Sequence, residues 1–205
     1  MKPLGVILAG GQARRMGGGD KGRLEISGIS LFHHVIERLS GHVNGIVINA
    51  NGDKTRFNDL SYEVVSDSIE GFAGPLAGVL AGLDHAAANG VDTIVTVAAD
   101  TPFYPRDLVT RLRDAVEDME APLALAATRG EGGKKWMHPT FGLWPVALRD
   151  DLRMHIQDGG RKVLGWTDRH MCRDVVFESG DFDPFFNINT AEDLEKAEQR
   201  VEQSR

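Results

Sequence analysis

The sequence has little cysteine and no long hydrophobic run. Cys172 is the only cysteine among 205 residues, so the chain cannot form an internal disulfide, and it contains no CxxC or zinc-type spacing. This favours a reducing compartment. The apolar run from Leu4 to Ala9 is far shorter than the roughly 20 residues of a membrane span, and it lacks a signal-peptide cleavage site. These absences predict a cytoplasmic protein with no targeting segment and no membrane contact.

The chain also lacks an excess of positive charge. It has 23 basic and 30 acidic residues, a formal net charge of −7, which argues against a protein that coats DNA or RNA. The charge is unevenly distributed. Residues 181–205 carry seven acidic and three basic residues, a balance of −4, whereas residues 10–24 carry four basic residues and one acidic residue, a balance of +3. An anionic ligand must therefore bind at a local basic site, for which residues 10–24 are the candidate.

The pattern of apolar residues indicates the fold class. The composition, 41% hydrophobic and 26% charged, is that of a globular protein, and the length favours a single domain over residues 1–205. Strands are expected at 4–8, 45–48, 93–98, 123–127, 138–143 and 175–177, and helices near Ser30, Pro75, Pro105, Pro145 and Thr190. Continuous apolar strands that alternate with helices predict an α/β fold with a mostly parallel central sheet.

A glycine-rich basic segment directly follows the first expected strand. Between Leu8 and Lys21 it contains five glycines and three basic residues. Glycines let backbone N–H groups approach an anion closely, and basic side chains supply the countercharge. Because α/β sheets bind ligands at the carboxyl ends of their strands, the segment predicts a phosphate site, with a plain surface loop as the alternative. It lacks the Gly-Lys-Ser/Thr of a P-loop, and its GxGxxG letters lie too far past the strand for a dinucleotide-binding turn.

Three other polar residues, two of them directly after expected strands, are candidates for contact with a ligand. Asp100 comes after an apolar strand, where its carboxylate could bind Mg²⁺ or could cap the turn before Pro102. Asn49 and Asp67 could contact a ligand, or could be a strand-end turn residue and a cap. The residues alone leave both alternatives open.

Small residues recur along one face of the helix that begins near Pro75. Gly74, Gly78 and Gly82 lie four positions apart, with alanines beside them. In a chain without a membrane span, this spacing predicts close packing on the sheet or close approach of a ligand.

Seven motifs in order along residues 4–194 resemble those of nucleotidyltransferases, and within that group the MobA family of molybdenum cofactor guanylyltransferases. The motifs are Leu8-Ala9-Gly10-Gly11 with Arg15-Met16-Gly17 and Asp20-Lys21, Ile48-Asn49-Ala50-Asn51, Val65-Ser66-Asp67, Gly74-Pro75-Leu76-Ala77-Gly78, Ala99-Asp100-Thr101-Pro102, His138-Pro139-Thr140 and Asn187-Ile188-Asn189-Thr190. The resemblance implies a three-layer Rossmann-like nucleotidyltransferase fold. It also implies transfer of GMP from GTP to the terminal phosphate of molybdopterin, with release of pyrophosphate and with Mg²⁺ as the cofactor.

The resemblance further implies roles for individual residues. Asp100 would bind the metal, and Lys21, Arg15 and Asn189 would act with it in catalysis. The GTP-binding residues would be Leu8, Ala9, Gly10, Gly11, Lys21, Asn49, Asp67 and Asp100, so that the N-terminal part of the chain binds the nucleotide.

The C-terminal part would then bind molybdopterin. The residues expected on that side are His138, Arg161 and Asn187. The residues alone also allow other readings, because His138 could be a satisfied core histidine, and Arg161 with Lys162 could be a solvated helix start.

Several functions compete with GMP transfer. The nearest alternative is a nucleotidyltransferase of the same fold that uses CTP on molybdopterin, or a nucleotide on a sugar phosphate. The cytidylyl relatives resemble Leu-Ala-Ala-Gly at the first motif, whereas this chain has Leu8-Ala9-Gly10-Gly11. A non-catalytic cofactor-binding adaptor is a further alternative. The partners expected are GTP, the molybdopterin cofactor and acceptor molybdoenzymes, with no nucleic acid.

Overall fold

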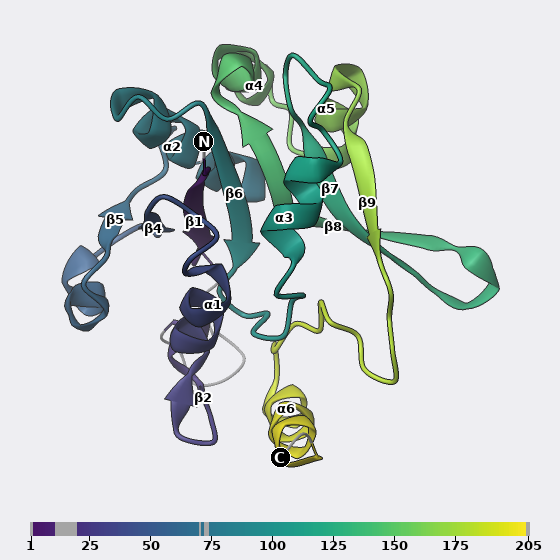
Figure 1. Ribbon diagram of the computed structural model, residues 1–205. Helices are drawn as coiled ribbons and strands as arrows, with labels where there is room; N and C mark the ends of the chain where they lie inside the picture. The colour runs from purple at the N-terminus through teal and green to yellow at the C-terminus, as the bar shows by residue number, and fades with distance from the viewer. Residues whose placement is uncertain (1, 11–19, 70, 72–73, 204–205) are drawn as a thin grey trace.

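A seven-stranded sheet forms the centre of the computed structural model, which describes residues 2–10, 20–69, 71 and 74–203 (Figure 1). The strand order is β5-β4-β1-β6-β8-β7-β9. The strands are β1 (Leu4–Leu8), β4 (Ile46–Asn49), β5 (Glu63–Val65), β6 (Thr93–Ala98), β7 (Ala124–Arg129), β8 (Lys135–Pro145) and β9 (Arg173–Phe177). Within this sheet β8 alone pairs antiparallel to its neighbours, β6 and β7. The expectation of a mostly parallel sheet is confirmed.

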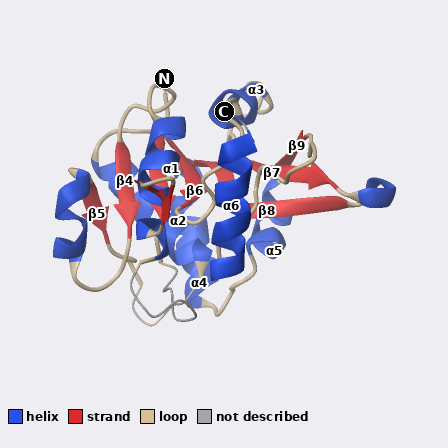
Figure 2. Ribbon diagram, turned by 90° about the horizontal axis from the view of Figure 1, so that it is seen from below, coloured by secondary structure: helices blue, strands red, loops and turns tan. Residues whose placement is uncertain are grey.

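Helices cover both faces of the sheet (Figure 2). The helices are α1 (Leu31–Leu39), α2 (Pro75–Ala88), α3 (Leu108–Asp114), α4 (Arg149–Gln157) and α5 (Val163–Thr167). Side chains alternate along each strand, so Ile7 faces a core with α1 and α3, whereas Val6 faces a core with α2, α4 and α5. The three-layer α/β fold class is confirmed. No helix among the described residues has the length and apolar character needed to cross a membrane.

A third, smaller core lies beyond the carboxyl ends of β1 and β6 (Figure 1). It joins the last helix, α6 (Ala191–Gln203), to a short hairpin of β2 (Glu25–Ile26) and β3 (Ile29–Ser30). Ile26, Leu31, Ile188 and Ala197 are fully buried in it. The C-terminal part of the chain is thereby attached next to the segment that follows β1.

Two of the expected helix starts are confirmed by their caps. The Ser30 hydroxyl accepts a hydrogen bond from the His33 N–H at 3.3 Å, which caps α1, and Pro75 is the first residue of α2.

Two other helices begin later than expected. Pro105 lies in a turn closed by the Leu108 N–H, so α3 begins at Leu108 and ends at Asp114. The helix expected from Pro145 begins at Arg149, because the 3₁₀ turn η5 (Val146–Leu148) comes first.

The strand expected at 138–143 is longer and forms a hairpin with β7. The hairpin extends away from the rest of the molecule (Figure 1). Its end contains the 3₁₀ turn η4 (Glu131–Gly133), and the Gly130 N–H donates to the Lys134 carbonyl at 2.7 Å. This tight reversal is what makes β8 antiparallel.

The small-residue face of α2 packs directly on the sheet. A Cβ at Gly78 would lie 2.3 Å from Oδ1 of Asn49 and 2.8 Å from Cδ2 of Leu8, and a Cβ at Gly82 would lie 2.8 Å from Cγ2 of Val6. For Gly78 and Gly82 the structure therefore shows close packing on the sheet, one of the two alternatives. The absence of a side chain at Gly78 lets α2 approach the carboxyl ends of β1 and β4.

Adding a methyl group to this face should destabilise the protein. Gly78→Ala and Gly82→Ala should each lower the free energy of unfolding by about 1–3 kcal/mol, because the helix must move off the sheet. Gly165→Ala in α5 is the control, since its Cβ would meet only Lys162 Cβ, at 3.7 Å. Alanine there should leave stability unchanged or raise it by up to ~1 kcal/mol through helix propensity. Urea unfolding curves measure all three, and equal stabilities would contradict the packing argument.

Candidate active site

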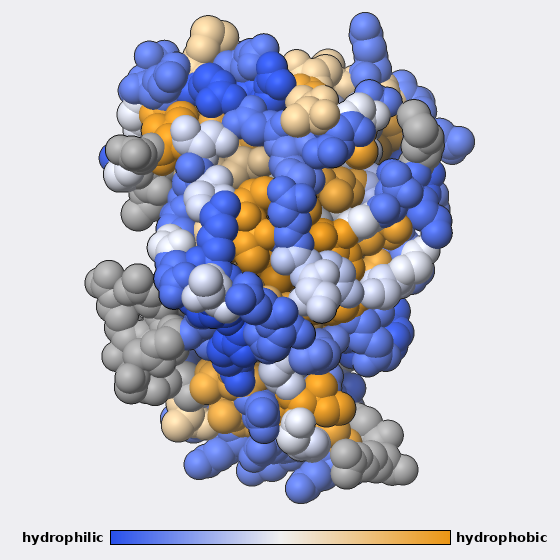
Figure 3. Space-filling model, turned by 90° about the vertical axis from the view of Figure 1, so that its left-hand side faces the viewer, coloured by the Kyte–Doolittle hydropathy of each residue, from blue (hydrophilic) through white to orange (hydrophobic). Residues whose placement is uncertain are grey.

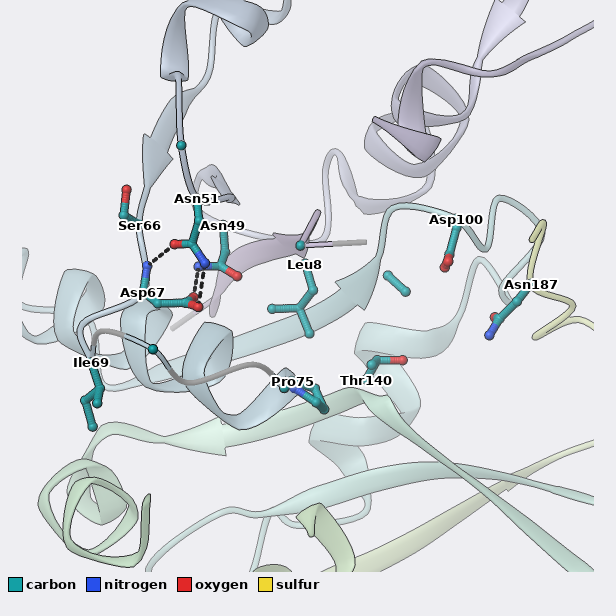
Figure 4. Close-up of a pocket in the computed structure, with 15 residues that line it drawn as sticks. Leu8, Asn49, Asn51, Ser66, Asp67, Ile69, Pro75, Asp100, Thr140 and Asn187 are labelled. Carbon is teal, nitrogen blue, oxygen red and sulfur yellow. Dashed lines mark hydrogen bonds between the residues drawn. The ribbon is translucent and has the colours of Figure 1, made fainter. Parts of the chain in front are cut away.

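A cleft of about 860 Å³ opens at the carboxyl ends of the parallel strands (Figure 4). β1, β4 and β6 reach it with Leu8, Asn49 and Ala98. Because β8 runs in the opposite direction, it contributes Thr140 from its first half. The other described lining residues are Gly10, Asn51, Gly52, Ser66, Asp67, Ile69, Gly71, Gly74, Pro75, Asp100 and Asn187. The cleft is therefore where the fold class places a ligand.

One end of the cleft contains a carboxylate held by two amides. The Nδ2 atoms of Asn49 and Asn51 donate to the two carboxylate oxygens of Asp67, at 2.9 Å and 2.7 Å, and the Asp67 N–H donates back to Oδ1 of Asn51 at 2.9 Å (Figure 4). The side chain of Asp67 is thus fixed in orientation and keeps lone pairs available for a ligand that donates hydrogen bonds.

At the other end, a lysine lies beside the lining residue Asp100 and contacts two oxygens. Lys21 begins the 3₁₀ turn η2 (Lys21–Arg23), and its Nζ lies 3.3 Å from Oδ2 of Asp100 and 2.5 Å from Oδ1 of Asn189. The Lys21 and Asp100 side chains are only 18% and 21% exposed, so water screens their attraction less than at an open surface. A Cβ at Gly22 would lie 2.4 Å from the Phe32 ring, so the glycine after Lys21 allows this turn to lie against α1.

The segment before α6 is fixed beside Asp100. The Thr101 hydroxyl donates to Oδ1 of Asn187 at 2.5 Å, and the Ile188 N–H donates to the Asp100 carbonyl at 2.8 Å. Oδ2 of Asp193 accepts from the N–H groups of Asn189 and Thr190, both at 2.9 Å. These backbone hydrogen bonds lower the pKa of Asp193, so its carboxylate stays ionised and holds the start of α6.

The structure brings most of the sequence-predicted nucleotide residues together. Leu8, Gly10, Asn49, Asp67 and Asp100 line the cleft, and so does Asn187 from the predicted molybdopterin side. Lys21 and Asn189 meet at Asp100, and Ala9 is buried beside Asn49, whose carbonyl accepts its N–H at 2.9 Å. Gly11 and Arg15 lie outside the described residues.

Two residues predicted for the molybdopterin side lie elsewhere. The His138 ring stacks on Phe185 at 4.1 Å, and its Nε2 lies 2.9 Å from the Thr128 hydroxyl. Burial lowers the pKa of His138, so its ring is neutral at neutral pH. Arg161 is exposed in the connection between α4 and α5. Among the described residues, neither side chain belongs to the lining of the cleft.

Sequence reasoning missed three polar residues of the cleft, Asn51, Ser66 and Thr140. The position of Asn51 could have predicted its role, because in an extended segment its side chain points to the same side as that of Asn49, two positions earlier. Ser66 and Thr140 belong to the motifs Val65-Ser66-Asp67 and His138-Pro139-Thr140, and in these motifs the resemblance assigns roles to Asp67 and His138 instead.

The donor set restricts how a metal could bind. Among the described residues there is no group of three or more His, Cys, Asp or Glu side chains that could enclose an ion. Oδ2 of Asp100 and Oδ1 of Asn189 do converge, on the Lys21 ammonium. Mg²⁺ is commonly held by one or two carboxylates together with substrate phosphates and water. These oxygens therefore fit an ion that arrives with a phosphate ligand.

Comparisons with known proteins show the family of the chain. The family model of the MobA-like NTP transferase domain matches residues 5–171. A molybdenum cofactor guanylyltransferase of Bradyrhizobium sp. (strain ORS 278) is 50% identical over 95% of this chain and 91% of its own length, and one of Nitrobacter hamburgensis is 47% identical over 95% and 92%.

Solved structures show the same fold. The molybdopterin-guanine dinucleotide biosynthesis protein A of Archaeoglobus fulgidus superposes with a TM-score of 0.73 at 25% identity, covering 98% of this chain and 99% of that protein. A CMP:2-keto-3-deoxy-manno-octonic acid synthetase complexed with CTP has a TM-score of 0.72 at 16% identity, covering both chains fully, and shows the fold alone. With a family model across most of its length and relatives up to 50% identical, the chain belongs to the MobA family of molybdenum cofactor guanylyltransferases.

Proposed function

We propose that the protein transfers GMP from GTP to the terminal phosphate of molybdopterin, which yields the guanine dinucleotide cofactor and pyrophosphate. The observation that carries the proposal is the meeting of Lys21, Asp100 and Asn189 at one end of a cleft whose other end is built around Asp67. The high identity to molybdenum cofactor guanylyltransferases supports the choice of substrates.

The reaction is a displacement at the α-phosphorus of GTP. An oxygen of the acceptor phosphate forms the new P–O bond, the bond to the bridging oxygen of the β-phosphate breaks, and pyrophosphate leaves with that electron pair. A phosphate monoester is already ionised at neutral pH, so the acceptor needs no strong general base. Both reactants are anions, so positioning and neutralisation of charge govern the rate.

The cleft offers separate groups for the two ends of the nucleotide. Asn49 and Asp67, with the backbone of Leu8, Ala9 and Gly10, would hold the guanine and ribose. Lys21 would bind the β- and γ-phosphates and stabilise the leaving pyrophosphate, with help from Arg15 and the backbone of Gly11.

The C-terminal part of the chain would bind the acceptor. Asn187 and Asn189 lie beside Asp100 and would contact the molybdopterin phosphate. Contact of His138 and Arg161 with the same substrate stays a prediction, because neither is in the described lining of the cleft. Release of the product to acceptor molybdoenzymes, in the cytoplasm, would complete the role.

Asp100, with Asn189, would hold Mg²⁺. The ion would supply positive charge at the phosphates and so would neutralise charge that builds up during the displacement. The Lys21 ammonium contacts the same two oxygens. Phosphates of GTP would attract Lys21 and so free both oxygens.

Lys21→Met should therefore have opposite effects on two ligands. It should raise the Kd for GTP about tenfold or more, since an ion pair to phosphate is lost. It should also tighten Mn²⁺ binding to the nucleotide-free protein, by roughly tenfold, because a cation no longer repels the ion at Asp100. Electron paramagnetic resonance of free Mn²⁺ measures the second effect, and weaker Mn²⁺ binding by the variant would refute the competition.

Asp100→Ala should keep the fold and lose most activity. We expect kcat to fall by roughly 100-fold or more, because the carboxylate that would hold the charge-neutralising Mg²⁺ at the phosphates is lost. Asp118→Ala is the control, since Asp118 pairs with Arg173 outside the cleft. Circular dichroism checks folding, and a folded Asp100→Ala protein with near-normal turnover would remove Asp100 from the mechanism.

A nucleotide competition tests the function itself. With molybdopterin as acceptor, GTP should support pyrophosphate release and CTP should not, as followed by a coupled phosphate assay. Preference for CTP would favour a cytidylyltransferase. Absence of pyrophosphate release with any nucleotide would favour the cofactor-binding adaptor.

A further inference from the structure

Arg56 joins two segments that approach the cleft from different parts of the chain. It lies in the 3₁₀ turn η3 (Lys54–Leu60), between β4 and β5. Its Nε lies 3.1 Å from Oδ2 of Asp20, and its Nη2 donates to the Asn51 carbonyl at 2.7 Å. Asp20 directly precedes Lys21, and Asn51 holds Asp67. One guanidinium therefore connects both ends of the candidate site.

The contact with Asp20 matters for Lys21. The Asp20 side chain is only 11% exposed, so its charge is poorly solvated by water. With Arg56 as its partner, Asp20 does not compete with Asp100 for the neighbouring ammonium. The Lys21 side chain is directed to Asp100 and Asn189 instead.

A second arginine also joins η2 to η3, but here the arginine belongs to η2 and its carboxylate partner to η3. Arg23 belongs to η2, and it forms a two-pronged pair with Asp59 of η3, at 3.0 Å and 2.6 Å. It also donates to the Arg56 carbonyl. The two short turns are thus held to each other from both sides.

Packing beneath Arg56 limits where its guanidinium can point. The group lies 4.8 Å from the centroid of the Phe57 ring, which is buried and meets Phe32 edge to face. η3 lies toward the β5 side of the sheet in Figure 1, and Figure 3 shows that this side of the molecule has mainly hydrophilic residues with hydrophobic patches between them. Arg56 is 35% exposed, so water reaches it but the ring sets its direction.

We infer that Arg56 is a positioning residue that fixes the distance between the phosphate-binding Lys21 and the nucleoside-binding Asp67. The inference rests on the proposed function. A nucleoside triphosphate engages both ends of the cleft at once, so it gains from a spacing that is fixed before binding. A fragment that engages only one end gains nothing from that spacing.

This difference provides the test. Titration calorimetry of Arg56→Ala should show a Kd for GTP raised about tenfold, while the Kd values for GMP and for inorganic pyrophosphate change by less than about twofold. Arg56→Lys should resemble Arg56→Ala, because an ammonium lacks the planar fork that reaches Asp20 and the Asn51 carbonyl together.

Arg173→Ala is the matched control. Arg173, the first residue of β9, likewise contacts a carboxylate and a backbone carbonyl, those of Asp118 and Ala115. Neither of these partners lines the cleft, whereas Asn51, the partner of Arg56, does. Its loss should leave all three Kd values unchanged.

Each other outcome has a definite meaning. An unchanged Kd for GTP in Arg56→Ala would overturn the inference and leave the proposed function intact. Equal weakening of GTP, GMP and pyrophosphate would show that Arg56 only supports the local fold, which also overturns it. Failure of the unmodified protein to bind GTP would instead overturn the proposed function, and the inference with it.

Discussion

The contact of the Lys21 ammonium with the Asp100 carboxylate and the Asn189 amide oxygen holds the candidate site together. It joins the turn after β1, the end of β6 and the segment before α6. The sheet fixes Asp100 and the third core fixes Asn189, so the lysine is placed by two independent parts of the fold. Arg56 extends this arrangement to the Asp67 end of the cleft. Partial burial strengthens the Lys21–Asp100 attraction, because water screens it less than at an open surface.

Much of the fold could be predicted from local signals, and the remainder depends on tertiary contacts. Apolar runs identify β1, β4 and β6, and Ser30 and Pro75 mark two helix starts. The three residues of β5 are too few for a periodic pattern, and they form a strand because β4 pairs with them. The direction of β8 depends on the reversal at Gly130, and an apolar strand reads the same in either direction.

The candidate site was predictable where a residue type and its place after a strand agree. Asn49 and Asp100 satisfy this condition. Asp67 follows β5, which no apolar pattern predicts, and only the family resemblance points to it. Arg56 does not satisfy the condition either, because it lies in a polar turn and its importance comes from Asp20, which no spacing in the sequence brings near it. His138 shows that a residue in a family motif need not reach the cleft. Thr140 of the same motif lines the cleft, whereas the His138 ring packs on Phe185.

The attachment of α6 has a consequence for the order in which the molecule is made. Asn189 comes 168 positions after Lys21, so a growing chain on the ribosome exposes β1, β4 and β6 long before the segment that completes the cleft. Until then Ile26 and Leu31 lack Ile188 and Ala197, which pack against them in the third core, and Lys21 lacks Asn189, one of its two oxygen partners. The contacts of Lys21 at the candidate site are therefore complete only after the segment that carries Asn189 has been made.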